Sequence, residues 1–171
     1  MTVQPYTQLI AVKQWADRGL YDVVGRNLEK LSPEEVSIML RIFDHIHTVD
    51  RIFQHHLQGI PHNFKAPRSE RMPELGVLES SAWEVDEWYV SYVEGLSAQD
   101  FGQPLEFVFT SGKAARMTRG EILLHVCLHG TYHRGNAGAV LQLKGLTPSR
   151  DSVSDYLEYG LATAETPRPT L

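Results

Sequence analysis

The chain has 171 residues, of which 42% are hydrophobic and 22% charged, with a formal net charge of -5. These values are typical of one globular domain over residues 1–171, and the absence of a long basic run argues against nucleic-acid binding. No apolar stretch approaches the roughly 20 residues of a membrane span, and the N-terminus lacks a signal-peptide pattern. Because Cys127 is the only cysteine, no intrachain disulfide is possible, which fits a reducing cytoplasm.

Two long amphipathic helices are predicted in the first third of the chain. Apolar residues at helical spacing predict the first over residues 6–31. Ser32 to Glu35 forms a capping box with proline at the first helical position, so the second helix begins there. Gly59 and Pro61 end this helix near Leu57. Its predicted apolar stripe consists of Ile38, Ile42, Val49, Ile52 and Phe53.

Two further helices and a hairpin are predicted after a loop over residues 61–73. The third helix spans about 75–96, and an alternating segment with a turn predicts a short β-hairpin over 103–117. A second capping box, Thr118 to Glu121, opens a fourth helix that ends near Lys144. A short helix is expected over 151–159 and a frayed tail over 162–171. This order predicts an all-α four-helix bundle with a short β-hairpin before the last long helix.

Three histidines, His125, His129 and His133, recur at intervals of four on the predicted fourth helix. This spacing stacks the side chains on one face, where neighbouring imidazoles can bind one metal ion. His125 and His133 lie about 12 Å apart along the helix axis, too far to share an ion at Zn–N distances of about 2 Å. The pattern therefore predicts a metal-binding pair, either 125 with 129 or 129 with 133.

A third ligand is expected from a facing helix, as in other bundle sites. His45 is the best candidate because it lies on the apolar stripe of the second helix, whereas His47 faces away from it. The competing interpretation of His45 is a hydrogen-bonded core residue. The remaining histidines, His55, His56 and His62, are expected to be solvated.

Simpler interpretations apply to the other polar groups nearby. Cys127 points away from His129 and is expected to be a core thiol. Asp44, Asp50 and Arg51 are expected to form a solvated or ion-paired helix face, with support of the metal ligands as the alternative. No Glu precedes a His by three residues, which argues against a di-iron carboxylate site. The nucleophile-elbow and phosphate-loop patterns are absent from the sequence.

Three segments carry a resemblance to a known family. The segment from His129 to Gly135 resembles the H-x-x-x-H-R-G signature of the DinB family of DinB/YfiT-like metalloenzymes. The segment from His45 to Phe53 resembles its second-helix motif, a histidine followed by an acidic–basic pair and an aromatic. Residues 15–21 resemble its W-A-N-x-x-L-Y segment, and the hairpin before the last long helix also matches.

The resemblance implies an up-down-down-up bundle that binds one divalent metal ion through His45, His129 and His133. It selects His133 over His125 as a ligand, although the position of His125 is often occupied by histidine in the family. Many members have Gln after H-R-G where this chain has Asn136, so contacts to substrate are expected to differ. A homodimer is also implied. The family name refers to damage inducibility and does not imply polymerase activity.

Three neutral imidazoles leave at least one coordination position open, which is typical of catalytic zinc. Imidazole suits several transition metals, and we expect one divalent ion, zinc or nickel. Related branches of the superfamily use low-molecular-weight thiols, as bacillithiol transferases and mycothiol-dependent isomerases do. The resemblance therefore implies a metal-dependent thiol S-transferase or hydrolase with a small-molecule substrate, in which Asp50, Tyr132 or Asn136 orients ligands or substrate. The alternative is a non-catalytic, stress-associated metal- or ligand-binding bundle.

Overall fold

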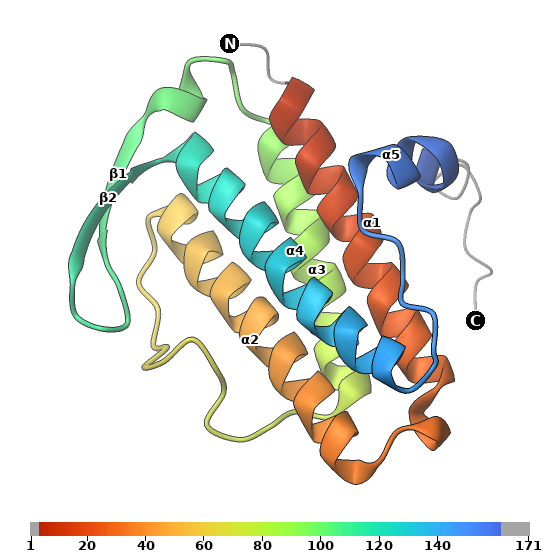
Figure 1. Ribbon diagram of the computed structural model, residues 1–171. Helices are drawn as coiled ribbons and strands as arrows, with labels where there is room; N and C mark the ends of the chain where they lie inside the picture. The colour runs from red at the N-terminus through yellow and green to blue at the C-terminus, as the bar shows by residue number, and fades with distance from the viewer. Residues whose placement is uncertain (1–3, 162–171) are drawn as a thin grey trace.

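Four long helices form the body of the protein in a computed structural model that describes residues 4–161. Their bounds are Gln4–Arg26 for α1, Pro33–Gln58 for α2, Leu75–Glu94 for α3 and Arg119–Leu143 for α4. α1 and α4 run in one direction, and α2 and α3 run in the other (Figure 1). Both α1 and α2 pack against α3 and α4. The predicted bundle and its up-down-down-up course are confirmed, and α2 and α4 are neighbours.

Short elements connect and flank the helices. These are the 3-10 turns η1 (Leu28–Lys30) and η2 (Asp100–Gly102), the strands β1 (Pro104–Val108) and β2 (Ala114–Thr118), and the C-terminal turns α5 (Val153–Asp155) and η3 (Tyr156–Gly160). The strands pair antiparallel, with Pro104 opposite Thr118, which confirms the predicted hairpin. The first helix ends at Arg26, earlier than the predicted end at residue 31, and the separate turn η1 follows it. The tail predicted to fray lies outside the described residues.

Both helices that carry the histidine motifs begin at the predicted capping boxes. Ser32 Oγ accepts a hydrogen bond from the Glu35 backbone N–H at 3.3 Å, and the Glu35 carboxylate accepts one from the Ser32 N–H at 2.8 Å. Thr118 and Glu121 repeat this arrangement at 3.2 and 2.7 Å. Each box satisfies N–H groups that the first helical turn leaves unpaired. Contacts between residues close in sequence therefore determine where each of these two helices begins.

Val49, Ile52 and Phe53 of the stripe predicted on α2 are buried, but the first half of the helix buries a different face. Ile38 is 45% exposed, and the adjacent Met39 is buried together with Phe43. The helical step from Met39 leads through Phe43 to the buried Ile46 and Phe53. His45 is therefore half-buried at the flank of this face rather than inside it. A position at the edge of the core lets a side chain reach a neighbouring helix and still meet solvent.

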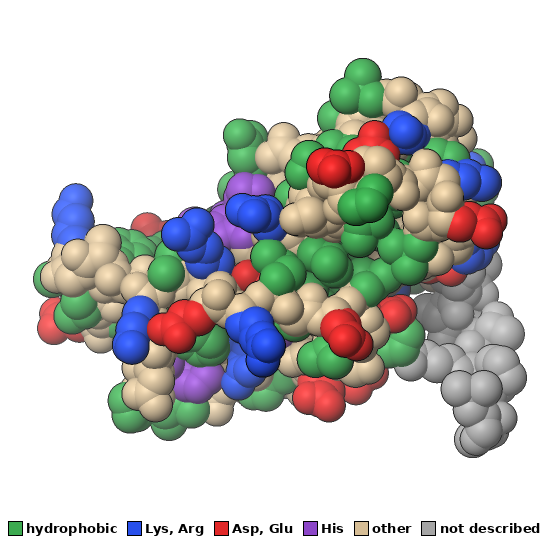
Figure 2. Space-filling view, turned by 90° about the horizontal axis from the view of Figure 1, so that it is seen from below, with side chains coloured by type: hydrophobic (Ala, Val, Ile, Leu, Met, Phe, Trp, Pro, Cys, Tyr) green, Lys and Arg blue, Asp and Glu red, His purple; other side chains and the backbone are tan. Residues whose placement is uncertain are grey.

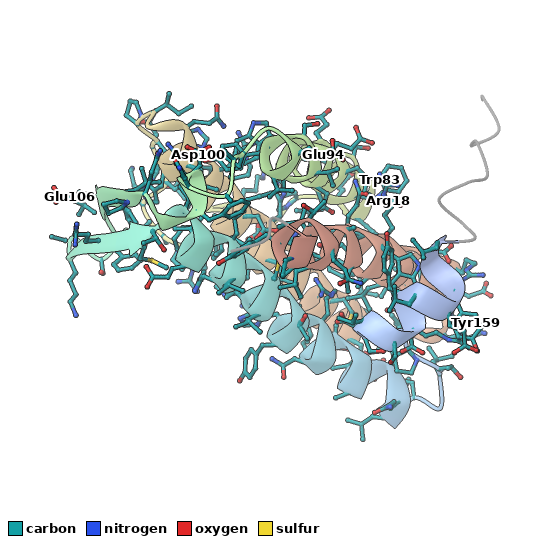
Figure 3. The ribbon with its side chains drawn as sticks, turned by 90° about the horizontal axis from the view of Figure 1, so that it is seen from above. Arg18, Trp83, Glu94, Asp100, Glu106 and Tyr159 are labelled. Atoms are coloured by element: carbon teal, nitrogen blue, oxygen red, sulfur yellow. The ribbon has the colours of Figure 1, made fainter. Side chains whose placement is uncertain are left out.

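Seen from above, the hairpin and the C-terminal turns lie at opposite ends of the bundle (Figure 3). Glu106 on the hairpin and Tyr159 near the C-terminus lie at opposite ends. Between them, the Arg18 guanidinium of α1 lies 5.7 Å from the ring centroid of Trp83 on α3. Among the described residues, no helix combines the length and apolarity that a bilayer crossing requires.

Candidate metal centre

Three histidines from α2 and α4 converge at the flank of the bundle. One ring nitrogen of each of His45, His129 and His133 lies within 4.8 Å of the others. The Nε2 atoms of His45 and His129 are 3.0 Å apart. Ring centroids are 4.8 Å apart for His45 and His129, and 4.5 Å apart for each pair that includes His133. Two nitrogens on one tetrahedral zinc are roughly 3.3 Å apart, so the arrangement fits a metal ion.

The segment between α2 and α3 orients His45. Its Nδ1–H donates a hydrogen bond to the carbonyl oxygen of Pro67 at 2.7 Å. Because a carbonyl only accepts, this bond fixes the tautomer and leaves the Nε2 lone pair facing His129. Metal-binding histidines commonly donate their other ring N–H in this way. The same segment is held to α2 by the Ser69 N–H, which donates to Asp44 Oδ2 at 2.9 Å.

The histidines on α4 are neutral at pH 7. Burial, reinforced by the neighbouring His133 and His45, lowers the pKa of His129 to about 3. Burial and the proximity of His45 also lower the pKa of His133. Neutral imidazoles have the lone pairs that metal coordination requires. His129 Nδ1 is shielded from solvent and has no hydrogen-bond partner in residues 4–161.

His125 occupies a different environment. Its ring centroid lies 4.7 Å from that of Phe53 and 5.5 Å from that of His129, against which it stacks. Burial lowers its pKa. The sequence alone allowed either pair on α4, and the structure brings His129 and His133 to His45 while His125 packs against Phe53.

Of two other predictions about polar residues, the one for His47 is wrong and the one for Cys127 is confirmed. His47 does not face away from the apolar face as predicted: it is buried, with Nε2 at 2.9 Å from the Ser81 hydroxyl on α3. Burial lowers the pKa of His47 to about 4. Cys127 is a buried thiol, and burial raises its pKa to about 12, as expected of a core cysteine rather than a reactive one.

Asp50 belongs to a buried ion cluster that was not predicted from the sequence. Lys13 Nζ lies 2.8 Å from Asp17, 2.8 Å from Asp50 and 2.7 Å from Asp86. Burial opposes the charge of Lys13, but its attraction to the three carboxylates raises its pKa well above the ordinary value. Asp50 is therefore ion-paired but not solvated, and it supports Lys13 rather than a histidine. The clue in the sequence was a Lys-x-x-x-Asp pair on the apolar face of α1.

Arg134, the arginine of the H-R-G segment, has a structural role. Its guanidinium is buried and lies 2.8 Å from Asp17 on α1 and 2.8 Å from Asp151 after α4. Bidentate contacts of this kind fix the orientation of arginine. Arg134 thus ties α4 to α1 and to the C-terminal segment, directly beside His133.

A cavity of about 1010 Å³ opens between α2 and the segment over residues 63–72. His45 lines it, together with the cationic side chains of Arg41, Lys65 and Arg68. In the view from below, lysine and arginine lie near the histidine patches on the surface (Figure 2). Of the residues expected to orient ligands or substrate, Tyr132 is exposed, with its ring 5.0 Å from that of His133. Asn136 is exposed on α4.

Comparison with known proteins agrees with the motif resemblance. Protein DinB of Bacillus subtilis (strain 168) is 30% identical over 84 residues, which are 49% of this chain and 48% of that protein. The alignment thus covers about half the length of this relative. No solved structure gives a significant match. The DinB family profile matches residues 1–166, and the chain therefore belongs to the DinB family.

Proposed function

We propose that the protein is a metal-dependent enzyme acting on a small molecule, with one divalent ion held by His45, His129 and His133. The observation that carries the proposal is the 3.0 Å separation of His45 Nε2 and His129 Nε2. The Pro67 carbonyl presents one of these nitrogens as a lone-pair donor, and burial keeps the other imidazole neutral. Zinc or nickel is the proposed ion, since both accept imidazole ligands.

Three protein ligands leave a position for water or substrate on the ion. When bound by His45, His129 and His133, the ion would supply Lewis-acid chemistry for water or a thiol. We propose Tyr132 as the residue that orients a substrate, because its ring is exposed and its centroid lies 5.0 Å from that of His133. The proposed reactions are transfer to or from a low-molecular-weight thiol and, second, hydrolysis.

Metal content of paired α4 variants tests the site. His129→Ala should lose one equivalent of metal relative to the wild type, because it removes a ligand common to both α4 pairs. His125→Ala is the matched control, one turn away on the same face, and should keep the wild-type content. Equal metal content in the wild type and His129→Ala, measured by elemental analysis after desalting, would refute the site.

Catalysis requires a separate test. Metal-loaded protein should turn over at least one substrate in a panel of thiol-transfer and ester- or amide-hydrolysis assays, and His129→Ala should be inactive. A loaded site without turnover across the panel would favour the alternative, a non-catalytic, stress-associated metal- or ligand-binding bundle.

We also propose that the protein forms a homodimer and that it is located in the cytoplasm. Leu124, Leu128 and Tyr132 form an exposed stripe on α4, with exposed fractions of 37%, 69% and 68%. Exposed apolar stripes on a helix are common at interfaces between protein chains. Sedimentation of the wild type should show a dimer, and Leu128→Glu should shift it to a monomer. A wild-type monomer would contradict the proposed dimer.

A further inference from the structure

The cavity beside His45 has an excess of positive charge. Its volume of about 1010 Å³ is large enough for a small organic molecule. The charged side chains that line it are three cations and two carboxylates, namely Arg41, Lys65, Arg68, Asp44 and Glu70. The lining is therefore net positive, although the chain as a whole carries a formal charge of -5. Figure 2 shows lysine and arginine on the same face of the molecule as histidine.

Two of these cations have no partner in the described part of the chain. Lys65 Nζ lies 3.7 Å from the Glu70 carboxylate, so these two charges offset each other. Arg41 and Arg68 form no ion pair, hydrogen bond or ring contact within residues 4–161. The buried Asp44 carboxylate is bonded to a backbone N–H instead. Guanidinium groups bind carboxylate and phosphate through paired hydrogen bonds, and an oxyanion in the cavity would supply the missing acceptor.

Both arginines are placed next to His45, although they come from different segments. Arg41 precedes His45 by one turn of α2, about 6 Å along the helix axis. Arg68 directly follows Pro67, whose carbonyl oxygen accepts the 2.7 Å hydrogen bond from His45 Nδ1. An anionic group held by these arginines would therefore lie beside a candidate metal ligand.

Phe64 supplies an apolar wall of the same cavity. Its ring centroid lies 5.8 Å from that of His55 and 5.5 Å from that of His62. The Arg51 guanidinium lies over the ring at 5.6 Å from its centroid. His55, His56 and His62 are half-buried, whereas the sequence predicted solvated side chains. These contacts hold the Phe64 ring in place, and an apolar wall favours a ligand with a carbon skeleton.

We propose that this cavity binds an organic anion, a small molecule that carries a carboxylate or phosphate group on a carbon skeleton. Arg41 and Arg68 hold the oxyanion, and Phe64 packs against the skeleton. The inference rests on the proposed function in one respect, since it identifies the bound anion as the substrate of the proposed enzyme. The substrate would then reach the ion from the side of His45.

NMR titration of small probes with the full chain, with and without zinc, tests the cavity. Benzoate and phenyl phosphate are the probes, and the tighter one identifies the preferred anionic group. Benzyl alcohol, which lacks the charge, should bind at least about 10-fold more weakly. Inorganic phosphate, which lacks the skeleton, should bind more weakly than phenyl phosphate. Equal binding of benzyl alcohol and both anions, or no binding of either anion at millimolar concentration, would overturn the proposal.

Arginine variants locate the binding site. Arg41→Ala and Arg68→Ala should each weaken binding of the tighter probe by about 10-fold or more, and Arg68→Lys should weaken it less. Arg71→Ala is the matched control, because Arg71 is an exposed arginine of the same segment outside the cavity lining. All these side chains are exposed, so the variants should unfold at the wild-type temperature. Wild-type affinity in Arg41→Ala and Arg68→Ala, or an equal loss in Arg71→Ala, would contradict the site.

Turnover separates this inference from the proposed function. In active, metal-loaded protein, Arg68→Ala should raise KM about 10-fold more for an anionic substrate than for the same compound with that group esterified. Arginine-dependent binding of the probes without turnover of any substrate would support the cavity and contradict only the proposed enzyme. Turnover of neutral substrates without binding of either anion would contradict only the cavity.

Discussion

Asp44 and Ser69 are joined by a hydrogen bond of 2.9 Å between a buried carboxylate and a loop backbone N–H. Asp44 is adjacent to His45 on α2, and Ser69 is two residues after Pro67. The bond therefore holds the loop at the point where the Pro67 carbonyl accepts from His45. Through this bond, Asp44 helps to place the carbonyl group that orients His45.

We predict that Asp44→Ala weakens metal binding by His45, His129 and His133 by about 10- to 100-fold. This is the usual effect of removing a residue that supports a metal ligand. The variant should keep all three histidines and bind metal with the same stoichiometry at saturation. Competition with a chelator measures the change in affinity. Glu70→Ala, an exposed carboxylate in the same loop, is the control and should bind like the wild type. Equal affinities for Asp44→Ala and the control would contradict the role of the loop.

Lys13→Met should destabilise the protein by about 3–5 kcal/mol at pH 8, because it leaves buried carboxylates without their cation. Lys65→Met, which removes an exposed lysine 3.7 Å from Glu70, should change stability by less than about 0.5 kcal/mol. Urea unfolding of the metal-free proteins measures both changes. A loss of under about 1 kcal/mol for Lys13→Met would show that the cluster is not held together as described.

The destabilisation of Lys13→Met should be smaller at pH 5 than at pH 8. Burial already raises the pKa of Asp50 to about 7 and that of Asp86 to about 6 in the wild type. Without Lys13, both pKa values rise further above the unfolded values. A raised folded-state pKa means that stability is greatest at low pH and falls as pH rises through the folded pKa. The same deficit at both pH values would exclude this titration.

Local patterns predicted much of the fold. The capping boxes at Ser32 and Thr118 are satisfied by groups within four residues, so helix starts can be read from short sequences. The common helical face of His125, His129 and His133 likewise follows from their spacing and helix geometry alone. What the sequence could not provide was the helical face that meets its neighbours, since the exposed Ile38 and the buried Met39 are both apolar.

The ion cluster was missed for a related reason. Lys13, Asp50 and Asp86 come from three helices, and each residue taken alone is typical of a solvated helix surface. Only the packing of the helices reveals that their charges meet inside the bundle. The support of His45 by Pro67 is a contact to a backbone carbonyl 22 positions away, for which side-chain identity carries no signal.

His47→Gln should reduce the pH dependence of stability in acid. The folded-state pKa of His47 is about 4, lowered chiefly by burial, against 6.5 when unfolded. Between these values the unfolded state binds more protons, so stability falls as the pH falls. The wild type should therefore lose roughly 2 kcal/mol more than His47→Gln between pH 7 and pH 5. Denaturant unfolding with a chelator present measures this, and identical pH slopes would contradict the buried neutral state of His47.

Two glycine substitutions in the α4 motif should have opposite effects. A Cβ at Gly130 would lie 2.7 Å from Arg134 Nη1, whereas a Cβ at Gly135 meets nothing within 4 Å. The guanidinium cannot easily move, since Asp17 and Asp151 hold it at 2.8 Å. Gly130→Ala should therefore destabilise the protein by about 1–3 kcal/mol.

Gly135→Ala should instead stabilise the protein by up to about 1 kcal/mol, because alanine is the better helix former. Thermal unfolding of the two variants beside the wild type is the measurement. If Gly130→Ala proved as stable as Gly135→Ala, the guanidinium of Arg134 would have room to move. The tie between α4 and α1 beside His133 would then be looser than the structure shows.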